Sequence, residues 1–240
     1  MTETYIIVGA TGGVGSVIAR DLSAAGHHLH LVGRDTAKLE SLCGQLGNAS
    51  YAVADAKISD QVATAVAEGA KSSVAGLVYA VGSIDLKPMA RVTNVDMMHA
   101  FQINVATAVV AVQAAAKALK STGGAVVLYS SVAAQRGFPN HVITGTVKAA
   151  IEGLTVALAA DMAPAVRVNT IAPSLLDTLM ARPILSSANM AEAIAKAHPL
   201  GRVGTAADVA HLTQLLLQKE TWITGQIFGV DGGRAAIAGK

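Results

Sequence analysis

A glycine-rich loop near the start of the chain carries the clearest chemical signal in the sequence. An apolar run at 6–8 precedes it, and apolar residues at helical spacing follow it. The glycines are Gly9, Gly12, Gly13 and Gly15. A strand, a glycine turn and a helix present free N–H groups and a positive dipole end to an anion, which predicts a phosphate-binding loop. Because the spacing is not G-x-G-x-x-G, a purely structural turn is the alternative.

Arg34 is the second candidate for ligand chemistry. It follows the predicted strand 28–33, and no acid precedes Asp35. In dinucleotide-binding folds an acid at this strand end binds the ribose 2′-hydroxyl, whereas an arginine can pair with a 2′-phosphate through two parallel hydrogen bonds. We therefore expect NADP(H) in preference to NAD(H), with an exposed arginine that binds no ligand as the alternative.

Two predicted helices carry polar residues of interest. Asn104 lies inside an apolar helix expected over 96–120, where asparagine competes for backbone hydrogen bonds and has low helix propensity. Thr144 and Lys148 are four residues apart in a helix expected over 143–161, so both lie on one face. Asn104 is therefore a functional candidate, and the other two share one environment.

No metal site is expected from the histidines near the second strand. His27, His28 and His30 are close in sequence, but no cysteine or carboxylate stands at ligand spacing among them. A solvated loop and strand start is the better interpretation.

The elements that must position these groups alternate along the chain. Strands are expected at 6–8, 28–33, 51–54, 75–80, 125–129, 166–172 and 226–230. Helices are expected at 36–46, at 59–71 with Ser59 as its cap, at 96–120, at 143–161, and at 208–217 after a capping box from Thr205 to Asp208. This alternation predicts a single α/β domain over 1–240 with a parallel, right-handed, doubly wound sheet. The polar segment 180–197 is expected to be a mobile lid over the carboxyl edge.

Composition argues against several classes of function. The net charge is +2 without a basic block and aromatic residues are only 3%, so nucleic acid is not an expected partner. Polar residues interrupt every apolar run and the start of the chain lacks a basic leader, so we expect neither a membrane span nor a signal peptide. The lone Cys43 excludes an internal disulfide and fits a reducing cytosol, which predicts a cytoplasmic protein.

Taken in order, these pieces resemble the classical short-chain dehydrogenase/reductase family over almost the whole chain. The resemblance is carried by the glycine loop, by Asp55 and Gly82 after the third and fourth strands, and by three longer motifs. They are VRVNTIAPS at 166–174, PLGRVGTAADVA at 199–210 and GQIFGVDGG at 225–233. The resemblance implies a seven-stranded Rossmann sheet, a nicotinamide cofactor, a small carbonyl or alcohol substrate, and a homotetramer or homodimer assembled through the two long helices.

The resemblance also implies roles for individual residues. Cofactor contacts would come from Gly9, Thr11, Gly12, Gly13, Val14, Gly15, Arg34, Asp55, Gly82, Lys148, Pro173 and Thr178. The family's catalytic group is an asparagine, a serine, a tyrosine and a lysine, which places Asn104, Ser131 and Lys148 in three of these roles. The tyrosine stands four residues before the lysine, where this chain has Thr144.

Replacement of the phenol matters because a neighbouring ammonium can bring the pKa of a tyrosine toward neutrality, whereas a threonine hydroxyl is a far weaker acid. Three alternatives follow. Thr144 could hold a water or a substrate oxygen. His141, seven residues before Lys148, has the spacing of the tyrosine in the related enoyl-reductase branch and could supply the proton, unless it is a solvated loop residue. Or the protein binds NADP(H) without catalysis, as a sensor or oligomer partner. Tyr79 and Tyr129 are expected to be packing residues.

Overall fold

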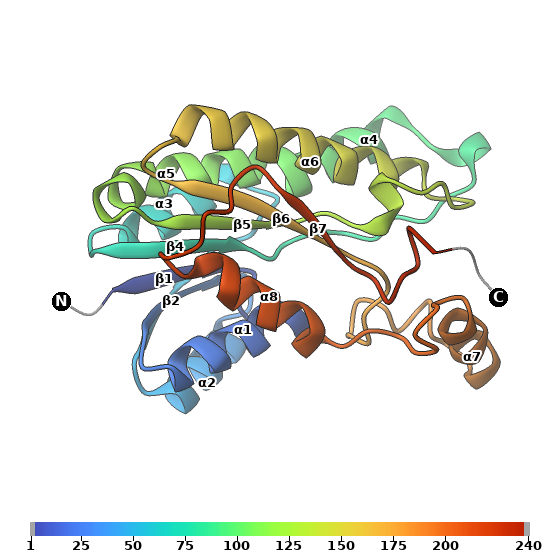
Figure 1. The fold of residues 1–240 in the computed structure, drawn as a ribbon, viewed down its shortest axis with the longest axis horizontal. Helices are drawn as coiled ribbons and strands as arrows, with labels where there is room; N and C mark the ends of the chain where they lie inside the picture. Colours follow the sequence, from blue (N-terminus) through green and yellow to red (C-terminus); the bar gives the residue numbers. More distant parts are fainter. Residues whose placement is uncertain (1–2, 238–240) are drawn as a thin grey trace.

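The computed structural model describes residues 3–237, which form one seven-stranded parallel sheet (Figure 1). The strands are β1 (Thr4–Val8), β2 (His28–Gly33), β3 (Ala49–Val53), β4 (Val74–Tyr79), β5 (Ala125–Tyr129), β6 (Arg167–Pro173) and β7 (Ile227–Val230). Their order is β3-β2-β1-β4-β5-β6-β7, and it reverses between β1 and β4. The predicted doubly wound α/β fold is therefore confirmed, while residues 1–2 and 238–240 of the predicted domain lie outside the described residues.

Helices cover both faces of the sheet. They are α1 (Gly13–Ala24), α2 (Thr36–Leu46), α3 (Ser59–Gly69), α4 (Asn94–Phe101), α5 (Thr107–Thr122), α6 (Val142–Met162), α7 (Ala188–Lys196) and α8 (Ala206–Leu217). Helices α3, α5 and α6 lie on one face and α1, α2 and α8 on the other, while α7 lies at the carboxyl end of the sheet (Figure 1). The predicted elements are thus present, with ends that differ by a few residues.

The alternation of side chains along each strand builds two cores. In β1, Ile6 and Val8 pack with the α3 and α5 side, whereas Tyr5 and Ile7 pack with the α1 and α8 side. All five residues of β1 are buried, as expected for a strand covered by helices on both faces. The carboxyl edge, where the loops leave the strands, is the part of the sheet left for ligands.

Two local expectations are wrong. Ile58, not Ser59, occupies the N-cap of α3, because the Ser59 hydroxyl lies 2.9 Å from the Thr107 hydroxyl and joins α3 to α5. His30 is not solvated but only 2% exposed, and its ring nitrogens bond Ser50 and the Ala65 carbonyl. Burial therefore lowers the pKa of His30.

The helix expected over 96–120 begins earlier and is not uniform. A π-helical turn, Gln102–Ala106, separates α4 from α5, and Asn104 lies inside it. A π turn leaves some carbonyls without their usual helical partner, and here the Tyr79 hydroxyl donates to the Ile103 carbonyl at 2.6 Å. Asn104, an unusual residue for the interior of a helix, therefore marks the position of the π-helical turn.

Two helical stretches, Asn94–Thr122 and Val142–Met162, are long and apolar enough to cross a membrane by length and composition alone. Their inner positions form part of the core on the α3 side of the sheet, with 44% and 39% of their most apolar windows buried. Packing on the sheet accounts for the apolar character of these inner positions.

The segments that follow β6 are held by caps. The Thr205–Asp208 capping box at the start of α8 is confirmed, with both reciprocal bonds present. The predicted lid, 180–197, contains α7, whose N-cap Ser187 accepts a hydrogen bond from the Met190 N–H. The segment predicted to be a lid therefore consists of a helix with connecting loops at the carboxyl edge of the sheet.

Candidate cofactor and active site

The glycine loop is shaped by close approaches that exclude side chains. Gly9 has a φ of +86°, and a Cβ on it would lie 2.8 Å from the Ala80 carbonyl oxygen. A Cβ on Gly15 would lie 2.3 Å from the Gly9 carbonyl oxygen, so α1 packs directly on the loop. Gly12 is the N-cap of α1 and no side chain caps the helix. The first N–H groups of α1, in Gly13, Val14 and Gly15, are therefore available to an anion.

Segments far apart in sequence meet beside this loop. A Cβ on Gly13 would lie 2.7 Å from Thr178 Cγ2, so the chain that leaves β6 after Pro173 crosses the start of α1. A Cβ on Gly33 would lie 3.3 Å from the Thr11 hydroxyl, which places Thr11 beside the end of β2. The structure thus brings together the loop, the end of β2 and the start of the lid.

Of the charged residues at the end of β2, Asp35 has partners within the protein, whereas Arg34 has none within residues 3–237. Asp35 caps α2 by accepting from the Lys38 N–H and pairs with the Lys38 ammonium at 2.9 Å, contacts that lower the pKa of its carboxyl. Arg34 is exposed and has no hydrogen-bond or ion-pair partner within residues 3–237. Asp55 lies after β3, where its carboxylate accepts from the Lys57 N–H at 3.0 Å. The one acid next to Arg34 is therefore committed to its own helix.

Gly82, Asn104 and Lys148 form a tight polar cluster. A Cβ on Gly82 would lie 3.0 Å from both Asn104 Oδ1 and Lys148 Nζ. The ammonium donates to the Tyr129 carbonyl at 2.9 Å, and its burial lowers the pKa of Lys148 to about 8. Asn104 Nδ2 donates to the Ala100 carbonyl, while Asn104 Oδ1 is buried without a partner in the described chain. Such an oxygen calls for a donor from a ligand or water.

Ser131 stands at the entry to this cluster. It follows β5, is partly exposed, and its hydroxyl accepts from the Ala133 N–H at 3.2 Å, which opens the 3₁₀ turn Val132–Ala134. Its neighbour Ser130 points inward, where its hydroxyl shares its one proton between the Lys148 carbonyl at 3.0 Å and a Glu152 carboxylate oxygen at 2.9 Å. Ser130 thus holds α6 against the end of β5. The hydroxyl proton of Ser131 remains available at the open edge of the sheet.

Thr144 is engaged with a loop that the sequence did not connect to it. Its hydroxyl accepts from the Asp85 N–H at 3.1 Å and donates to the Asp85 carbonyl at 3.2 Å, and the residue is 5% exposed. The Asp85 carboxylate in turn accepts from Ser83, whose hydroxyl lies 3.3 Å from Asn104 Nδ2. Because the only proton of the hydroxyl is used, Thr144 holds the 83–88 loop over the site.

The tyrosines of the neighbouring strands are not free either. The Tyr79 hydroxyl bonds Ile103, and the Tyr129 hydroxyl lies 2.5 Å from the Thr213 hydroxyl. Burial raises the pKa of both phenols. Both are packing residues, as the sequence predicts.

His141 differs from these groups because one of its ring nitrogens is unused. Nδ1 lies 2.8 Å from the Pro139 carbonyl oxygen, which can only accept, so Nδ1 carries a proton. Nε2 has no hydrogen-bond partner within residues 3–237. The residue is the N-cap of α6 and is partly exposed. Seven residues make about two helical turns, so His141 and Lys148 lie on the same side of α6.

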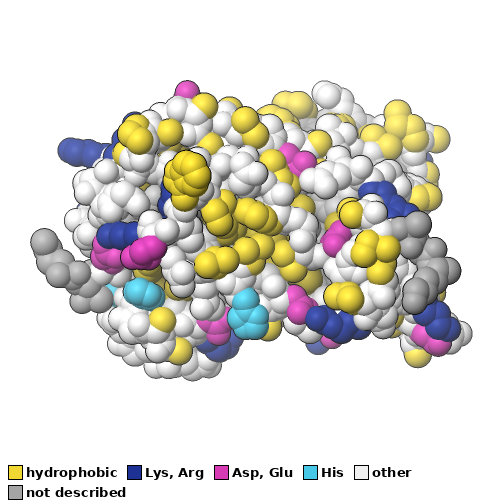
Figure 2. Space-filling model, viewed as in Figure 1, with side chains coloured by type: hydrophobic (Ala, Val, Ile, Leu, Met, Phe, Trp, Pro, Cys, Tyr) yellow, Lys and Arg dark blue, Asp and Glu magenta, His cyan; other side chains and the backbone are white. Residues whose placement is uncertain are grey.

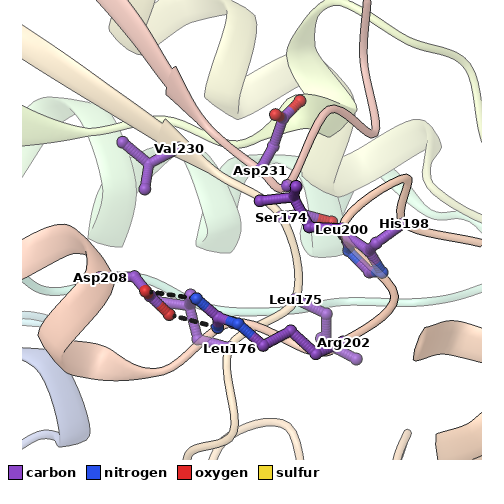
Figure 3. A pocket seen from close by; sticks show the side chains of 11 residues that line it. Ser174, Leu175, Leu176, His198, Leu200, Arg202, Asp208, Val230 and Asp231 are labelled. Carbon is purple, nitrogen blue, oxygen red and sulfur yellow. Dashed lines mark hydrogen bonds and ion pairs between the residues drawn. The ribbon is translucent and has the colours of Figure 1, made fainter. Parts of the chain in front are cut away.

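A small cavity of ≈ 100 Å³ lies beside the site, under the end of β7 (Figure 3). It is far smaller than the several hundred Å³ that a ligand pocket usually has, so the open edge of the sheet remains the place for a cofactor. In its lining Arg202 pairs with both oxygens of Asp208, drawn as dashed lines in Figure 3. His198 bonds the Ile194 carbonyl and the Ser174 hydroxyl at 2.7 Å each, which ties the end of α7 to the end of β6.

Comparison with known proteins agrees with this geometry. The family model described as Enoyl-(Acyl carrier protein) reductase matches residues 9–235. The chain is 31% identical to L-xylulose reductase of Bos taurus, over 95% of this chain and 94% of that protein. The chain belongs to the classical short-chain dehydrogenase/reductase family.

Other members of the short-chain dehydrogenase/reductase family are similar over their whole length. Carbonyl reductase family member 4 of Danio rerio is 30% identical over 97% of this chain and 98% of its own. A short-chain type dehydrogenase/reductase from Mycobacterium ulcerans has a structure that superposes with a TM-score of 0.92 at 29% identity, covering 99% of this chain and 91% of that one. The protein is accordingly an oxidoreductase.

The residues of the site fit the nicotinamide cofactor of this family. The glycine cradle would be filled by any Cβ, the start of α1 is uncapped, and Asn104 Oδ1 is a buried acceptor without a donor. The hydrogen bonds between Asp85 and Thr144 were not predicted from the sequence, because no local pattern in either segment indicates contact with the other.

We predict that Lys148→Met raises stability at pH 7 while it removes activity. The pKa of Lys148, about 8, lies below its usual value near 10.4, so the folded protein must hold a buried ammonium below pH 8. Stability therefore rises between about pH 8 and 10.4, and the variant should gain about 1–3 kcal/mol at pH 7 and less at pH 10. Urea unfolding at both pH values measures this. Lys117→Met, an exposed control on α5, should change little, and a Lys148→Met protein no more stable than wild type contradicts the prediction.

Proposed function

We propose that the protein is an NADP(H)-dependent oxidoreductase that transfers hydride to or from a small carbonyl or alcohol substrate. The observation that carries the proposal is the convergence of three groups at one edge of the sheet: the uncapped start of α1, the unpartnered Arg34, and the cluster of Gly82, Asn104 and Lys148. The nicotinamide supplies the hydride chemistry when it is bound.

In this proposal the chain's own groups bind and orient. The N–H groups at the start of α1 hold the pyrophosphate, and Arg34 pairs with the 2′-phosphate. Lys148 and the free oxygen of Asn104 hold a ribose hydroxyl or an ordered water in the polar cluster. The Ser131 hydroxyl donates to the substrate oxygen and polarises the carbonyl.

The proton at the substrate oxygen is assigned to His141. Its Nδ1–H bond to Pro139 fixes the ring, and its Nε2 is free to donate when the ring is charged and to accept when it is neutral. Thr144 is assigned the structural role of holding the 83–88 loop, since its proton is used on Asp85. The site is therefore non-canonical without being inactive.

A homo-oligomer, dimer or tetramer, is part of the same proposal. Apolar side chains remain exposed on the long helices: Val95, Met98 and Phe101 on α4, Val109 on α5, and Val142 and Val156 on α6. A second apolar area lies near β7, where Trp222 is fully exposed beside the partly buried Ile223 and Phe228, and Figure 2 shows hydrophobic side chains across this region. A second copy of the chain would cover these surfaces.

Arg34→Ala should weaken NADPH binding by about 10- to 100-fold, the scale of a hydrogen bond to a charged group. NADH lacks the 2′-phosphate, so its affinity should not change. Calorimetry with both cofactors measures this. Arg20→Ala, an exposed control on α1 with its own partner at Gln45, should leave both affinities unchanged. Equal dissociation constants of the two cofactors for the wild type contradict the preference.

His141→Ala should lower turnover of carbonyl substrates by about 10²–10⁴-fold, the usual contribution of a general acid. NADPH affinity should be unchanged, because the ring is not a cofactor contact. Thr144→Tyr should also lose activity, since the ring would displace Asp85 and the 83–88 loop. A panel of ketones and diketones, read by NADPH oxidation, compares these variants with wild type and with the exposed-histidine control His211→Ala.

Two outcomes of that panel decide between the alternatives. If wild type is inactive and Thr144→Tyr gains turnover, the site is a crippled version of the tyrosine mechanism. If no protein oxidises NADPH with any carbonyl, the chain binds the cofactor without catalysis. Either result overturns the role given to His141.

Light scattering at micromolar concentration should give a multiple of the chain mass. Phe101→Ser and Trp222→Ser each remove one exposed apolar side chain and should weaken association, because that area would again face water. Leu179→Ser changes another exposed apolar residue, which lies before α7, and serves as the control. A wild-type monomer under these conditions contradicts the proposal.

A further inference from the structure

We propose that the substrate carries an anionic group, a carboxylate or a phosphate, which is bound by Arg136 and Arg234. The inference rests on the proposed oxidoreductase function and names the class of substrate that this site takes. It begins from two arginines that come from segments far apart in sequence and meet beside His141.

Both guanidinium groups lie over one aromatic ring. Their central carbons are 5.9 Å (Arg136) and 5.4 Å (Arg234) from the centroid of the Phe138 ring. The centroid of the Phe138 ring lies 5.3 Å from that of the His141 ring. Phe138 therefore joins the pair of cations directly to the residue to which we assign the proton.

The two side chains are held in place by backbone carbonyls. Arg136 donates to the carbonyl of Arg234, and Arg234 donates to the Ala197 carbonyl at 2.6 Å, at the end of the lid helix α7. A guanidinium has five N–H donors in a planar fork, so each group retains several donors after these bonds. The pair is fixed before a ligand arrives, which lowers the entropic cost of binding.

Neither arginine has an acidic partner in the part of the chain that the structure describes. Asp231 is close in sequence to Arg234, but its carboxylate accepts from the Gly233 and Ala235 N–H groups. Both guanidinium groups lie over the Phe138 ring, and Arg136 also bonds the Arg234 carbonyl, so the two cations are close. Burial and the positive charge of Arg136 both lower the pKa of Arg234. An anion bound between them would relieve this repulsion.

The structural arginines of the chain look different. Arg202 forms two bonds with the carboxylate of Asp208. Arg167 donates to the Leu216 and Gln218 carbonyls and to the Thr221 hydroxyl. The guanidinium groups of Arg167 and Arg202 each donate several hydrogen bonds to protein acceptors. Among the described residues, those of Arg136 and Arg234 each donate to one protein acceptor. Stacking on Phe138 alone needs only one cation.

The position of the pair fits the substrate end of the site. Arg136 lies five residues after Ser131, and Arg234 connects the chain after β7 to the end of the lid. In Figure 1 the chain after β7, the lid helix and the start of α6 all lie at the carboxyl end of the sheet. A substrate whose carbonyl lies at Ser131 and His141 would have its other end toward the two arginines.

The test compares substrates that differ only in charge. Acetoacetate is compared with methyl acetoacetate, and dihydroxyacetone phosphate with dihydroxyacetone, which separates a carboxylate from a phosphate preference. The wild type should favour the anion of at least one pair by about tenfold or more in kcat/KM. Arg136→Gln and Arg234→Gln should each lower the ratio of kcat/KM for the anion to kcat/KM for its uncharged counterpart, mainly through the KM of the anion. Arg91→Gln, an exposed arginine before α4, is the control.

A separate binding measurement keeps the two proposals distinguishable. Calorimetry with acetoacetate and with inorganic phosphate, on protein saturated with NADP⁺, reports the anion site without turnover. Binding that is lost in Arg136→Gln supports the site even if no substrate is reduced, a result that would overturn only the proposed function. Turnover of the uncharged substrates with no anion preference, or anion binding unchanged in both variants, overturns the inference. Since Arg234 also anchors the lid, Arg136→Gln remains informative if Arg234→Gln fails to fold.

Discussion

Holding the Lys148 ammonium inside an apolar core constrains the elements around it, because a buried charge needs a hydrogen-bond partner and is costly without one. The Tyr129 carbonyl at the end of β5 supplies that partner. The hydroxyl of Ser130, the next residue, bonds the Lys148 carbonyl. The end of β5 is therefore joined to α6 by two hydrogen bonds, one to the side chain and one to the backbone of Lys148. Gly82 must then lack a side chain, because a Cβ there would press on the ammonium. The ends of β4 and β5 and the face of α6 are fixed together by this one group.

The π turn in the helix that runs from α4 to α5 belongs to the same arrangement. It places Asn104 Oδ1 as close to Gly82 as the ammonium is, while Tyr79 bonds the carbonyl of the preceding residue. A buried oxygen without a donor costs free energy in the free protein, which a ligand or water can recover. A hydroxyl group placed there would accept a hydrogen bond from the ammonium and donate one to the amide oxygen. Such strain is tolerated where binding relieves it.

Local motifs in the sequence correctly predicted the glycine turn before α1, the strand β2 and the helix cap of α8. The glycine loop, the residue after β2 and the capping box each depend on neighbours within a few positions, so their chemistry can be read from spacing. The contacts that the sequence did not reveal join distant segments: Thr144 with Asp85, and Arg136 with Arg234 through Phe138. His30 shows the same limit, since its burial comes from Ser50 on β3 and Ala65 on α3. The contacts and burial of these residues depend on tertiary packing, which local sequence patterns do not encode.

The glycine loop and the other parts of the candidate site differ in how freely their residues can be substituted. The glycine loop is confined by backbone: any side chain on Gly9 or Gly15 collides with a carbonyl oxygen, and no rotamer change can relieve that contact. The side chains on the 131–141 loop, on the segment 180–197 and on the chain after β7 are not confined in this way and can change one at a time. Thr144 shows how one side chain can position a whole loop, because its hydroxyl bonds the backbone of Asp85 and holds the 83–88 loop. A substitution at Thr144 therefore also frees the backbone of Asp85, so this side chain and the 83–88 loop must be considered together.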